Sequence, residues 1–486
     1  MATNSEDPDH YGALVIGSGQ GGTPLTMSLA KAGHRTLLIE ATHIGGTCIN
    51  EGCTPTKTMV SSARIAALTT RGPDYGVRYK RSSLALDMET VRKRKRDIVD
   101  SFRSGGESRL TNQDNVEILF GRARFVGERT VEVTRKDGNG SGNGNDGTKR
   151  TVKADRVFVN VGCRPAGLQA KNADKVACLD STSIMELGEV PRHLVVVGGG
   201  YVGIEFAQMF RRFGAKVSVV QRGKRLLPRE DEDVSDAVRK ILTEDGVEIF
   251  TEAETKEISN VPTGQIVLGV GLPGGNVKTL LCSHVLVAGG RVPNTTDLDC
   301  DAAGIQLDER GFIKVNGELE TSADNVWALG DVKGGPQFTH VSYDDFRILE
   351  HNLVTSRNSK PKSTEGRLVP YTVFMDPQLG RVGLTLAAAQ HVFPQRKLQV
   401  AKMPMEWVAR ALETAETRGF MKAVVDEETR EILGFACLGI EGGEVMSQVQ
   451  IAMMGGLTYD KLRDGIFAHP CLSEALNNLW GTLEKA

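Results

Sequence analysis

Two glycine-rich segments restrict the fold of this chain more than any other feature, because each lies directly between an apolar strand-like run and a helix-like run. The first, at residues 17–22 (GSGQGG), follows the run Ala13 to Ile16 and precedes the run Leu25 to Ala32. A second strand-like run, Arg35 to Ile39, then ends at Glu40. This order predicts a βαβ unit with the G-x-G-x-x-G fingerprint of a dinucleotide-binding fold.

The residue types in this unit suit the binding of a dinucleotide. Gly17, Gly19 and Gly22 permit a tight turn and a close approach of a pyrophosphate to the backbone. The N-terminus of the following helix offers free N–H groups and the positive end of the helix dipole. Glu40 stands 18 residues after Gly22, where its carboxylate can accept both hydroxyls of an adenosine ribose.

The same pattern recurs near the middle of the chain. Residues 198–203 (GGGYVG) follow the strand-like run Leu194 to Val197 and precede a helix-like run from Ile204 to Phe213. The fingerprint positions are Gly198, Gly200 and Gly203, and the next strand-like run is Lys216 to Val220. The chain therefore carries two predicted dinucleotide sites of Rossmann type.

The two sites differ at the end of their second strand. The residue 18 positions after Gly203 is Gln221, followed by the cations Arg222, Lys224 and Arg225. An acid there would repel a 2′-phosphate, whereas arginine and lysine would bind it. We therefore expect the second site to favour NADPH over NADH, with NADH still possible. The alternative is that these cations are an ordinary solvated charge run.

Length and charge set further limits. The chain has 486 residues, which at roughly 150 residues per domain indicates about three domains. Its formal net charge is −2 and 40% of its residues are apolar, so nothing favours binding to nucleic acid or to an acidic membrane. The first ten residues lack the features of a secretory signal, and no apolar run is long enough to cross a bilayer. We expect a cytoplasmic protein.

The remaining segments complete the predicted architecture. Residues 137–147 (DGNGSGNGNDG) form a polar low-complexity segment between strand-like runs at 130–134 and 151–152, which indicates a long hairpin loop rather than a domain linker. The last part of the chain mixes strand-like runs at 423–425 and 432–438 with helix-like runs at 444–454 and 473–480. It has no nucleotide fingerprint and is predicted to be an α+β domain.

Only two of the eight cysteines, Cys48 and Cys53, lie close together in the sequence. In a reducing compartment such a pair is more often catalytic or metal-binding than structural. A metal site would need two further soft ligands nearby, and the sequence has none there. At a helix start Cys53 would gain thiolate character from the helix dipole, and Lys57 follows one helical turn later. The preceding glycines, Gly45 and Gly46, would allow a flat cofactor to approach.

Residues 45–57 (GGTCINEGCTPTK) closely resemble the redox motif of the flavin-dependent pyridine nucleotide–disulfide oxidoreductases, a family that includes dihydrolipoamide dehydrogenase, glutathione reductase and mercuric reductase. Further segments resemble other motifs of the family in the same order along the chain: residues 290–294 (GRVPN), 321–331 (TSADNVWALGD), 373–385 (VFMDPQLGRVGLT) and 469–474 (HPCLSE). The resemblance covers nearly the whole chain. It is nearest to the group around mercuric reductase, which also contains a copper-reducing enzyme of the defence against reactive chlorine species.

The resemblance implies an α/β fold with two Rossmann-like domains and a C-terminal α+β dimerisation domain. It implies a discontinuous FAD-binding domain at residues 1–160 and 285–360, an NAD(P)-binding domain at 161–284 and a dimerisation domain at 361–486. The cofactors implied are FAD and NADPH, and the partner implied is a second copy of the chain.

The resemblance also implies roles for particular residues. Cys53 would be the charge-transfer thiol beside the flavin and Cys48 the interchange thiol that faces the substrate. Lys57 and Glu205 would pair near the flavin, and Tyr201 would gate the nicotinamide pocket. His469, oriented by Glu474 and supplied by the other subunit, would be the acid–base, since histidine exchanges a proton near neutral pH. The cofactor sites would also draw on Gly46, Thr47, Ala123, Gly162, Arg291, Asp331 and Arg222.

The chain departs from the family pattern at three positions. Glu51 and Thr54 stand where relatives usually have small or apolar residues. A carboxylate at Glu51 would disfavour a neighbouring thiolate, or it could recognise a cationic or metal-bearing substrate. Cys471 stands where relatives usually have threonine and is expected to fill that space rather than to act as a third redox thiol. The terminal cysteine pair of mercuric reductase is missing, and so is its N-terminal C-x-x-C domain, which disfavours that activity.

Three functions remain open at this level. The first is an NAD(P)H-dependent reductase of a small disulfide, a metal ion or a similar acceptor. The second is an FAD-dependent dithiol oxidase that closes a disulfide in a small metabolite and passes electrons to O₂, because such an enzyme need not keep a nicotinamide site. The third is a flavin-bound protein without catalytic activity. The intact second fingerprint, with Glu205, favours the reductase, and intact Cys48, Cys53 and His469 disfavour the third.

Overall fold

The chain is organised as two compact units, each assembled from segments that are distant in the sequence. The computed structural model describes residues 9–80, 84–136, 145–355 and 359–486. The first unit comprises residues 1–58, 93–166 and 290–367, and the second comprises residues 59–92, 167–289 and 368–486. Helices α3 (Cys53–Thr70) and α4 (Met88–Thr111) each contribute residues to both units. The boundaries of the three predicted domains stay a prediction.

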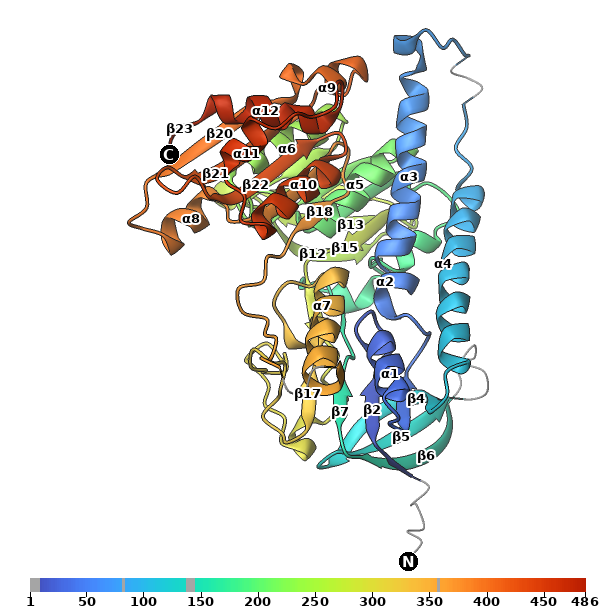
Figure 1. The fold of residues 1–486 in the computed structure, drawn as a ribbon. Helices are drawn as coiled ribbons and strands as arrows, with labels where there is room; N and C mark the ends of the chain where they lie inside the picture. Colours follow the sequence, from blue (N-terminus) through green and yellow to red (C-terminus); the bar gives the residue numbers. More distant parts are fainter. Residues whose placement is uncertain (1–8, 81–83, 137–144, 356–358) are drawn as a thin grey trace, which may run out of the picture. The chain divides into compact units, whose positions relative to one another are not determined.

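The first unit is built on an eight-stranded sheet (Figure 1). Its strands, in sheet order, are β1 (His10–Tyr11), β6 (Asn145–Ala154), β5 (Thr130–Lys136), β4 (Val116–Gly127), β3 (Thr36–Glu40), β2 (Ala13–Ile16), β7 (Val157–Val159) and β17 (Val326–Ala328). Strands β4, β3, β2, β7 and β17 are parallel to one another, whereas β5 pairs in antiparallel fashion with β4 and with β6. The unit also contains α1 (Gly22–Lys31), α2 (Gly46–Asn50), α7 (Thr339–Glu350) and the pair β8 (Cys163–Pro165) and β16 (Arg291–Pro293).

Strand β2 is apolar throughout because both faces of this sheet are covered. Successive side chains of a strand point to opposite faces. Ala13 and Val15 pack on the face that α1 and α7 cover, whereas Leu14 and Ile16 pack on the opposite face with apolar residues of β4, β5 and β6 (Figure 1). This two-sided burial is typical of parallel sheets. The predicted strand Ala13–Ile16 is confirmed with the same bounds.

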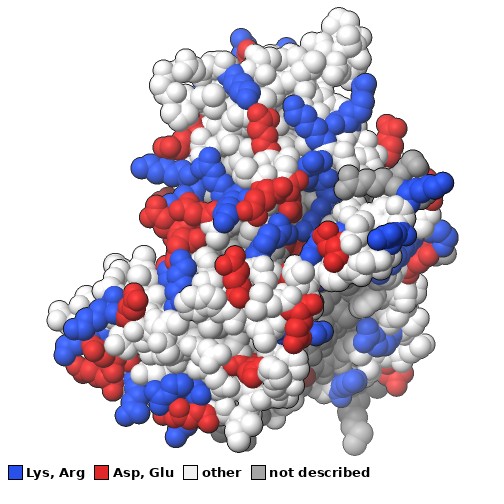
Figure 2. Space-filling model, turned by 90° about the horizontal axis from the view of Figure 1, so that it is seen from above, with Lys and Arg blue, Asp and Glu red and all other residues white. Residues whose placement is uncertain are grey.

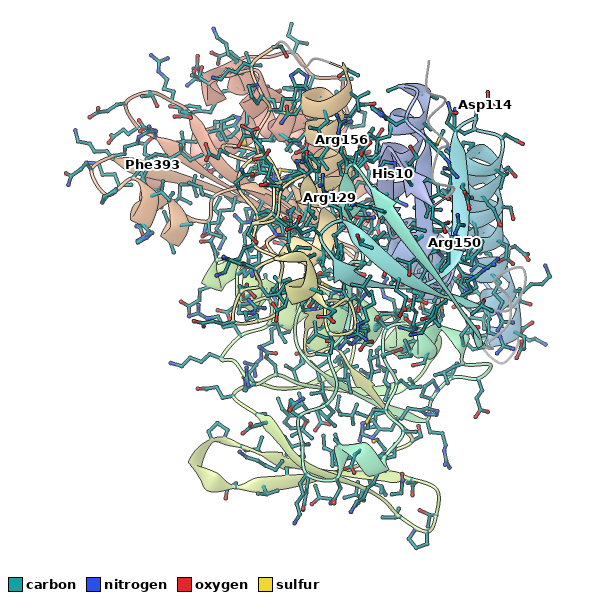
Figure 3. The ribbon with its side chains drawn as sticks, turned by 90° about the horizontal axis from the view of Figure 1, so that it is seen from below. His10, Asp114, Arg129, Arg150, Arg156 and Phe393 are labelled. Carbon is teal, nitrogen blue, oxygen red and sulfur yellow. The ribbon has the colours of Figure 1, made fainter. Side chains whose placement is uncertain are left out.

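Strand β1 is fixed at the edge of the sheet by one arginine of β6. Arg150 donates from Nη1 to Glu117 Oε1 at 2.6 Å, from Nη2 to the Tyr11 hydroxyl at 2.7 Å and from Nε to Asp9 Oδ1 at 2.8 Å. Figure 3 labels Arg150 and His10 on these two paired strands. One guanidinium therefore joins the first described residues of the chain to the middle of the sheet.

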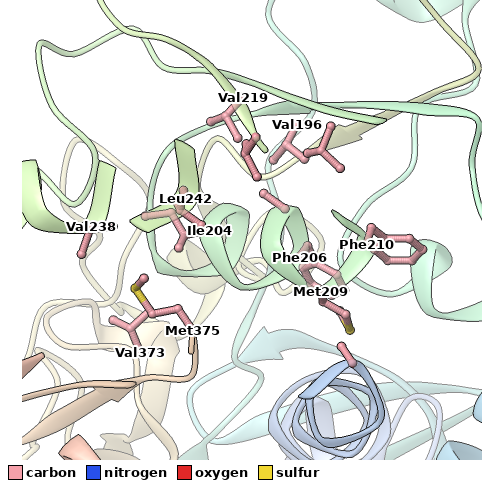
Figure 4. Close-up of a cluster of buried hydrophobic side chains, with 14 of the residues drawn as sticks. Val196, Ile204, Phe206, Met209, Phe210, Val219, Val238, Leu242, Val373 and Met375 are labelled. Atoms are coloured by element: carbon pink, nitrogen blue, oxygen red, sulfur yellow. The ribbon is translucent and has the colours of Figure 1, made fainter. Parts of the chain in front are cut away.

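The second unit repeats this plan around a smaller parallel sheet. Its strands, in sheet order, are β11 (Glu248–Phe250), β10 (Lys216–Val220), β9 (His193–Val197) and β15 (His284–Val287). Helices α5 (Tyr201–Phe213) and α6 (Glu232–Glu244) pack on the face that carries Leu194 and Val196. Val195 faces the antiparallel sheet of β12 (Glu254–Asn260), β13 (Ile266–Gly271) and β14 (Val277–Cys282). Figure 4 shows Val196 and Val219 on one side of α5 and Val373 and Met375 near the other.

The remainder of the second unit is a mostly antiparallel sheet with short helices. Its strands, in sheet order, are β18 (Tyr371–Val373), β19 (Gln378–Gly383), β22 (Ile432–Gly439), β21 (Phe420–Asp426), β20 (Leu398–Pro404) and β23 (Glu484–Lys485). The helices are α8 (Leu386–Val392), α9 (Ala409–Glu413), α10 (Gly442–Met454), α11 (Tyr459–Arg463) and α12 (Ala475–Leu479). The predicted mixture of α/β and α+β architecture is confirmed.

Two predicted elements differ from the structure in detail. The helical run expected at 473–480 consists of the five-residue α12 with a 3₁₀ turn at each end, as is common at helix termini. The Asn477 amide ties this run to the carbonyls of Leu462, Arg463 and Gly465. The expected hairpin is present, since β5 and β6 pair in antiparallel fashion, but β6 begins earlier than expected, and residues 137–144 lie outside the described residues.

The surface carries both signs of charge. On the face drawn in Figure 2, lysine and arginine side chains are interspersed with aspartate and glutamate, and neither sign forms a continuous field. Within the described ranges, the structure contains no helix with the length and apolar character that a bilayer crossing requires.

A buried ionic network joins the segment before α6 to the six-stranded sheet of the second unit. Arg381 of β19, whose side chain is 3% exposed, donates to Glu230 at 2.9 Å through Nε and to Asp231 at 3.2 Å through Nη2. The Tyr371 hydroxyl of β18 also donates to Glu230. Asp231 precedes α6, so the network links that helix to the β18–β19 hairpin.

Replacing Arg381 by methionine is expected to lower the free energy of unfolding by about 3 kcal/mol or more, because the substitution leaves the Glu230 carboxylate buried without its cation. The matched control is Arg410→Met on α9, whose partner Glu413 is exposed, and a change within about 1 kcal/mol is expected there. Urea unfolding followed by circular dichroism measures both. Equal losses in the two variants would contradict the structural role of the network.

Candidate functional site: a dithiol beside a glycine loop

Two cysteines come together on a short segment that we call the dithiol loop (residues 45–53). Cys48 lies in α2, and Cys53 is the first residue of α3. Both carry reduced thiols, Cys48 partly buried and Cys53 exposed, and a hydrogen bond with Cys53 contributes to the electrostatics of Cys48. The expectation that a helix starts at Cys53 is confirmed.

The path of the dithiol loop is fixed by Asn50 and by glycines. The Asn50 amide donates to the carbonyls of Ile44 at 3.0 Å and Gly46 at 2.9 Å, and Arg103 of α4 donates to the Asn50 side-chain oxygen at 2.7 Å. Gly45 adopts a φ of 102°, a conformation that favours glycine. These contacts close the single turn of α2 and bring Cys48 back toward Cys53.

The surroundings of Cys48 favour its protonated form. The hydrogen bond to Cys53 and burial raise the pKa of Cys48 above the ordinary value of a thiol, while the Thr339 hydroxyl and the charge of Lys57 act in the opposite direction. The loss of a proton is a property of the two coupled thiols together.

The dithiol loop packs directly on the first glycine loop (residues 17–22). A Cβ on Gly46, whose φ is +63°, would lie 2.6 Å from the Cα of Gly19. Two fingerprint glycines are restricted in the same way, because a Cβ on Gly17 would lie 2.4 Å from the Asn160 carbonyl oxygen and one on Gly22 would lie 2.1 Å from the Gly17 carbonyl oxygen. The close contact of the two loops therefore requires glycine at position 46.

Glu40, at the end of β3, binds the first glycine loop with its carboxylate. Its Oε2 accepts from the Ser18 backbone N–H at 2.9 Å and from the Ser18 hydroxyl at 2.6 Å, and its Oε1 accepts from the Thr42 N–H at 2.8 Å. The Ser18 hydroxyl also accepts from the N–H of Gly45. The acid is therefore held at the loop, and the dithiol loop shares the same network.

Some of the remaining residues expected to hold FAD lie close to one another. Arg291 lies 3.7 Å from Asp331 and donates to the Cys163 carbonyl, next to Gly162. Burial raises the pKa of Asp331. Ala123 lies on β4, three residues beyond the residue that pairs with Glu40, and Thr47 and Lys57 flank the cysteines in sequence.

These residues fit a flavin dinucleotide. The Arg291 Nε is a buried donor for which the described part of the chain offers no acceptor. Buried donors are normally satisfied, so an acceptor from a bound group is expected at this position. The glycine contacts, the strand-end acid and the dithiol lie in the same unit as this donor, which supports the fit.

The second glycine loop (residues 198–203) has the same construction with a different strand-end residue. A Cβ on Gly198 would lie 2.4 Å from the Ala288 carbonyl oxygen, and one on Gly203 would lie 2.1 Å from the Gly198 carbonyl oxygen. Gly200 precedes α5, which begins at Tyr201. The Gln221 amide oxygen accepts from the Gly199 N–H at 2.8 Å. Gln221 thus accepts an N–H of this loop as Glu40 accepts one of the first loop, but the Gln221 amide carries no charge.

The three cations after Gln221 differ in their surroundings. Arg225 forms an ion pair with Glu232 of α6. Arg222 is exposed and interacts electrostatically with Glu254, and Lys224 is also exposed. Arg222 and Lys224 are therefore the side chains best available to a 2′-phosphate.

The Glu205 side chain is held by hydrogen bonds between α5 and the segment that follows β18. Its Oε1 accepts from the Phe374 N–H at 2.8 Å. One turn later, Gln208 donates to the Asp376 carbonyl at 2.8 Å and accepts from the Asp376 N–H at 2.7 Å. This reciprocal pair fixes the backbone that holds Glu205. Lys57 belongs to the first unit and Glu205 to the second, and their pairing stays a prediction.

His469 and Glu474 form a hydrogen-bonded pair near the end of the second unit. Nδ1 of His469 lies 2.9 Å from Glu474 Oε2, and the His469 side chain is 68% exposed. With Nδ1 turned to the carboxylate, Nε2 is the nitrogen available to a substrate. Cys471 donates to the Ala468 carbonyl at 2.7 Å and lies 3.0 Å from the Ser473 hydroxyl, so its thiol is bound within its own turn.

Several contributors were not found from the sequence. Thr339 lies beside both cysteines, Asn160 packs on the first glycine loop, and Gln208 clamps the backbone beside Glu205. Gln208 alone had a local signal, its position three residues after Glu205 on one face of a helix. Thr339 and Asn160 are distant in sequence from the loops they contact, and no pattern marks them.

Comparison with known proteins gives matches along most of the chain. A family model described as pyridine nucleotide-disulphide oxidoreductase matches residues 11–345, and the model of the dimerisation domain of that family matches residues 369–480. A probable pyridine nucleotide-disulfide oxidoreductase, RclA of Escherichia coli (strain K12), is 36% identical over 477 residues, which cover 98% of this chain and 99% of the relative.

Two further relatives are named for other activities. A mercuric reductase of Bacillus cereus is 30% identical, and the match covers 100% of this chain and 73% of that protein. A dihydrolipoyl dehydrogenase of Thermus scotoductus is 32% identical, and the match covers 98% of both chains. Among solved structures, the Cu(II) complex of the HOCl-induced flavoprotein disulfide reductase RclA from Escherichia coli matches with a TM-score of 0.86 and 36% identity, covering 97% of this chain and 99% of that one.

Replacing Gly46 by alanine is expected to reduce the flavin content of the purified protein to less than about half, because the new methyl group would displace the first glycine loop at a cost of about 1 kcal/mol or more. The ratio of flavin to protein absorbance measures this content. Gly33→Ala is the matched control, since Gly33 also has a positive φ (+87°) but a Cβ there would meet nothing within 4 Å. Equal flavin content in the two variants would contradict the contact between the loops.

Proposed function

The chain belongs to the pyridine nucleotide-disulphide oxidoreductase family, and we propose that it passes electrons from NADPH through FAD and the Cys48–Cys53 pair to a small disulfide, a metal ion or a similar acceptor. The observation that carries the proposal is the dithiol itself. Two thiols hydrogen bonded to each other lie on a loop whose backbone packs against a dinucleotide-binding loop.

FAD and a pyridine nucleotide are the cofactors of this family. FAD, when bound, supplies two-electron exchange with both a nicotinamide and a disulfide. We infer that Gly17, Gly19 and Gly22 hold its pyrophosphate and Glu40 its ribose, with Arg291 and Asp331 further along the cofactor. The three-domain division given above is part of the same proposal, with the FAD site in the first and discontinuous domain.

The chain's own groups account for the transfer to a disulfide acceptor. Cys48 attacks one sulfur of the acceptor, forms a mixed disulfide and releases a thiolate that takes a proton from His469. Cys53 then attacks Cys48, releases the second thiolate and closes the Cys48–Cys53 bond. The acceptor gains two electrons and leaves as two thiols once a second proton is taken up. Glu474 holds the imidazole of His469 in orientation.

The family dimerisation domain supports a homodimer. We infer that each active site draws His469 from the second copy, as the resemblance implies. Lys57 and Glu205 would pair beside the cofactor, with Glu205 kept in place by the Phe374 N–H and by Gln208. Tyr201, the first residue of α5, would lie over the nicotinamide site.

A metal ion is a reasonable acceptor to test first. The Escherichia coli structure that is 36% identical to this chain is described as a Cu(II) complex, and a pair of thiolates is a soft ligand set that suits copper. Glu51 within the dithiol loop adds a carboxylate that would attract a cation. Since Cu(II) accepts one electron, two ions would be reduced for each dithiol oxidised.

Anaerobic mixing with NADPH tests the direction of electron flow. The wild-type protein is expected to show rapid loss of flavin absorbance and then a long-wavelength band from a thiolate beside the oxidised flavin. Cys48→Ser is expected to show that band before any nucleotide is added, because Cys53 is then a free thiolate. If neither NADPH nor NADH reduces the flavin, but a dithiol does so with peroxide formed in air, the dithiol oxidase replaces the reductase.

Arg222→Glu tests the preference for NADPH. The ratio of kcat/KM for NADPH to that for NADH is expected to fall about tenfold or more, because a carboxylate would repel the 2′-phosphate. Lys240→Glu on α6, where the lysine is exposed and lies near Glu244, makes the same charge change elsewhere and should leave the ratio unchanged. An unaltered ratio in Arg222→Glu would show that the cation cluster does not select the nucleotide.

A further inference from the structure

One hydroxyl lies between the two sulfurs of the redox pair. Thr339, the first residue of α7, donates from Oγ1 to the Cys48 sulfur at 3.0 Å, and the same oxygen lies 3.4 Å from the Cys53 sulfur. All three residues belong to the first unit. A threonine hydroxyl has a single proton to donate and can rotate, so it can serve either sulfur but not both at once.

The chemistry of the pair makes such a donor significant. Reductive cleavage of the Cys48–Cys53 bond takes up two electrons and, near neutral pH, one proton, which leaves one thiol and one thiolate. A hydrogen bond to a charged group is stronger than one to a neutral group. The donor will therefore turn to whichever sulfur carries the charge, and it lowers the free energy of that state.

We propose that Thr339 is a shared hydrogen-bond donor of the dithiol, which stabilises the thiolate on Cys48 or Cys53 in turn and so sets how the negative charge divides between them. The interchange sulfur must carry the charge when it attacks an acceptor, and the other sulfur must carry it when the disulfide closes. The hydroxyl supports both states without moving its backbone. The inference rests on the proposed redox role of the pair.

The groups around the two sulfurs act on them in different ways. Lys57 acts on Cys48 through its charge. This effect acts at a distance, so it does not select one of two neighbouring sulfurs as a hydrogen bond does. Two further titratable residues are near this group in sequence: Glu51, two residues before Cys53, and His340, which follows Thr339. The Thr339 hydroxyl, by contrast, lies within hydrogen-bond distance of both sulfurs.

The test measures the pH dependence of thiol alkylation in the holoenzyme. The protein is reduced anaerobically with dithiothreitol, which supplies two electrons as its own thiols close into a disulfide. After its removal, the protein is treated with iodoacetamide from pH 5 to pH 10. Mass spectrometry gives the alkylation rate at Cys48 and at Cys53 separately. The variants are Thr339→Val, which replaces the hydroxyl by a methyl group of similar size, and Thr339→Ser, which keeps it.

In Thr339→Val the midpoint of the alkylation profile is expected to rise by about one pH unit, because a thiolate that loses a charge-assisted hydrogen bond forms at higher pH. The ratio of Cys48 to Cys53 products should fall about threefold, because the hydroxyl lies closer to Cys48. Thr339→Ser should match the wild type, and so should Thr69→Val, which removes a hydroxyl elsewhere on α3 that bonds to the Ile65 carbonyl.

Two outcomes would overturn the proposal: superimposable profiles for Thr339→Val and the wild type, or a shift in Thr339→Ser as large as that in Thr339→Val. Thr339→Ala, which removes the hydroxyl without adding apolar volume, is measured in parallel and must shift in the same direction as the valine variant. Because alkylation requires only reduced thiols, the result is independent of nucleotide. Failure of NADPH to reduce the flavin would therefore count against the proposed function and not against the role of Thr339.

Discussion

The close approach of two backbones in the first unit is the constraint on which the rest of the site depends. The dithiol loop and the first glycine loop meet where neither Gly46 nor Gly19 has a side chain, and a methyl group on Gly46 would lie 2.6 Å from Gly19. The Ser18 hydroxyl accepts from the Gly45 N–H and donates to Glu40, so one network holds both loops. In the proposed function, this network would hold a cofactor on the glycine loop beside two sulfur atoms.

The two glycine loops share one construction. In each, the first and last fingerprint glycines contact backbone so closely that no Cβ fits, and the strand-end residue accepts an N–H from the loop. The strand-end residue is charged in one case and neutral in the other. In the proposed function, Glu40 would offer a carboxylate to ribose hydroxyls, whereas Gln221 accepts an N–H from its loop and would present no charge to a phosphate. The strand-end residue is therefore where the two loops differ most in charge.

Local patterns were sufficient to predict the βαβ units and the dithiol. The strand Ala13–Ile16 is buried on both faces and therefore reads as a continuous apolar run, and Cys48 and Cys53 lie within one loop, so their spacing carries the information. Contacts between segments that are distant in the sequence produce no local sequence pattern. Thr339 lies 291 residues from Cys48 in sequence, and Gln208 bonds to a backbone 168 residues away. The helical run predicted at 473–480 is present, but the sequence did not indicate that its two ends are 3₁₀ turns around the short helix α12.

The central claim, that Cys48 and Cys53 exchange an electron pair with a nucleotide through a flavin, is tested most directly by counting thiols. The air-oxidised protein is treated with an alkylating agent before and after one equivalent of NADPH, without oxygen, and the modified cysteines are identified by mass spectrometry. The account predicts that Cys48 and Cys53 are linked and unmodified at first, and that both become modified after NADPH, while the other cysteines are unchanged. A flavin that is reduced while the pair stays linked, or a pair that is never linked, would contradict it.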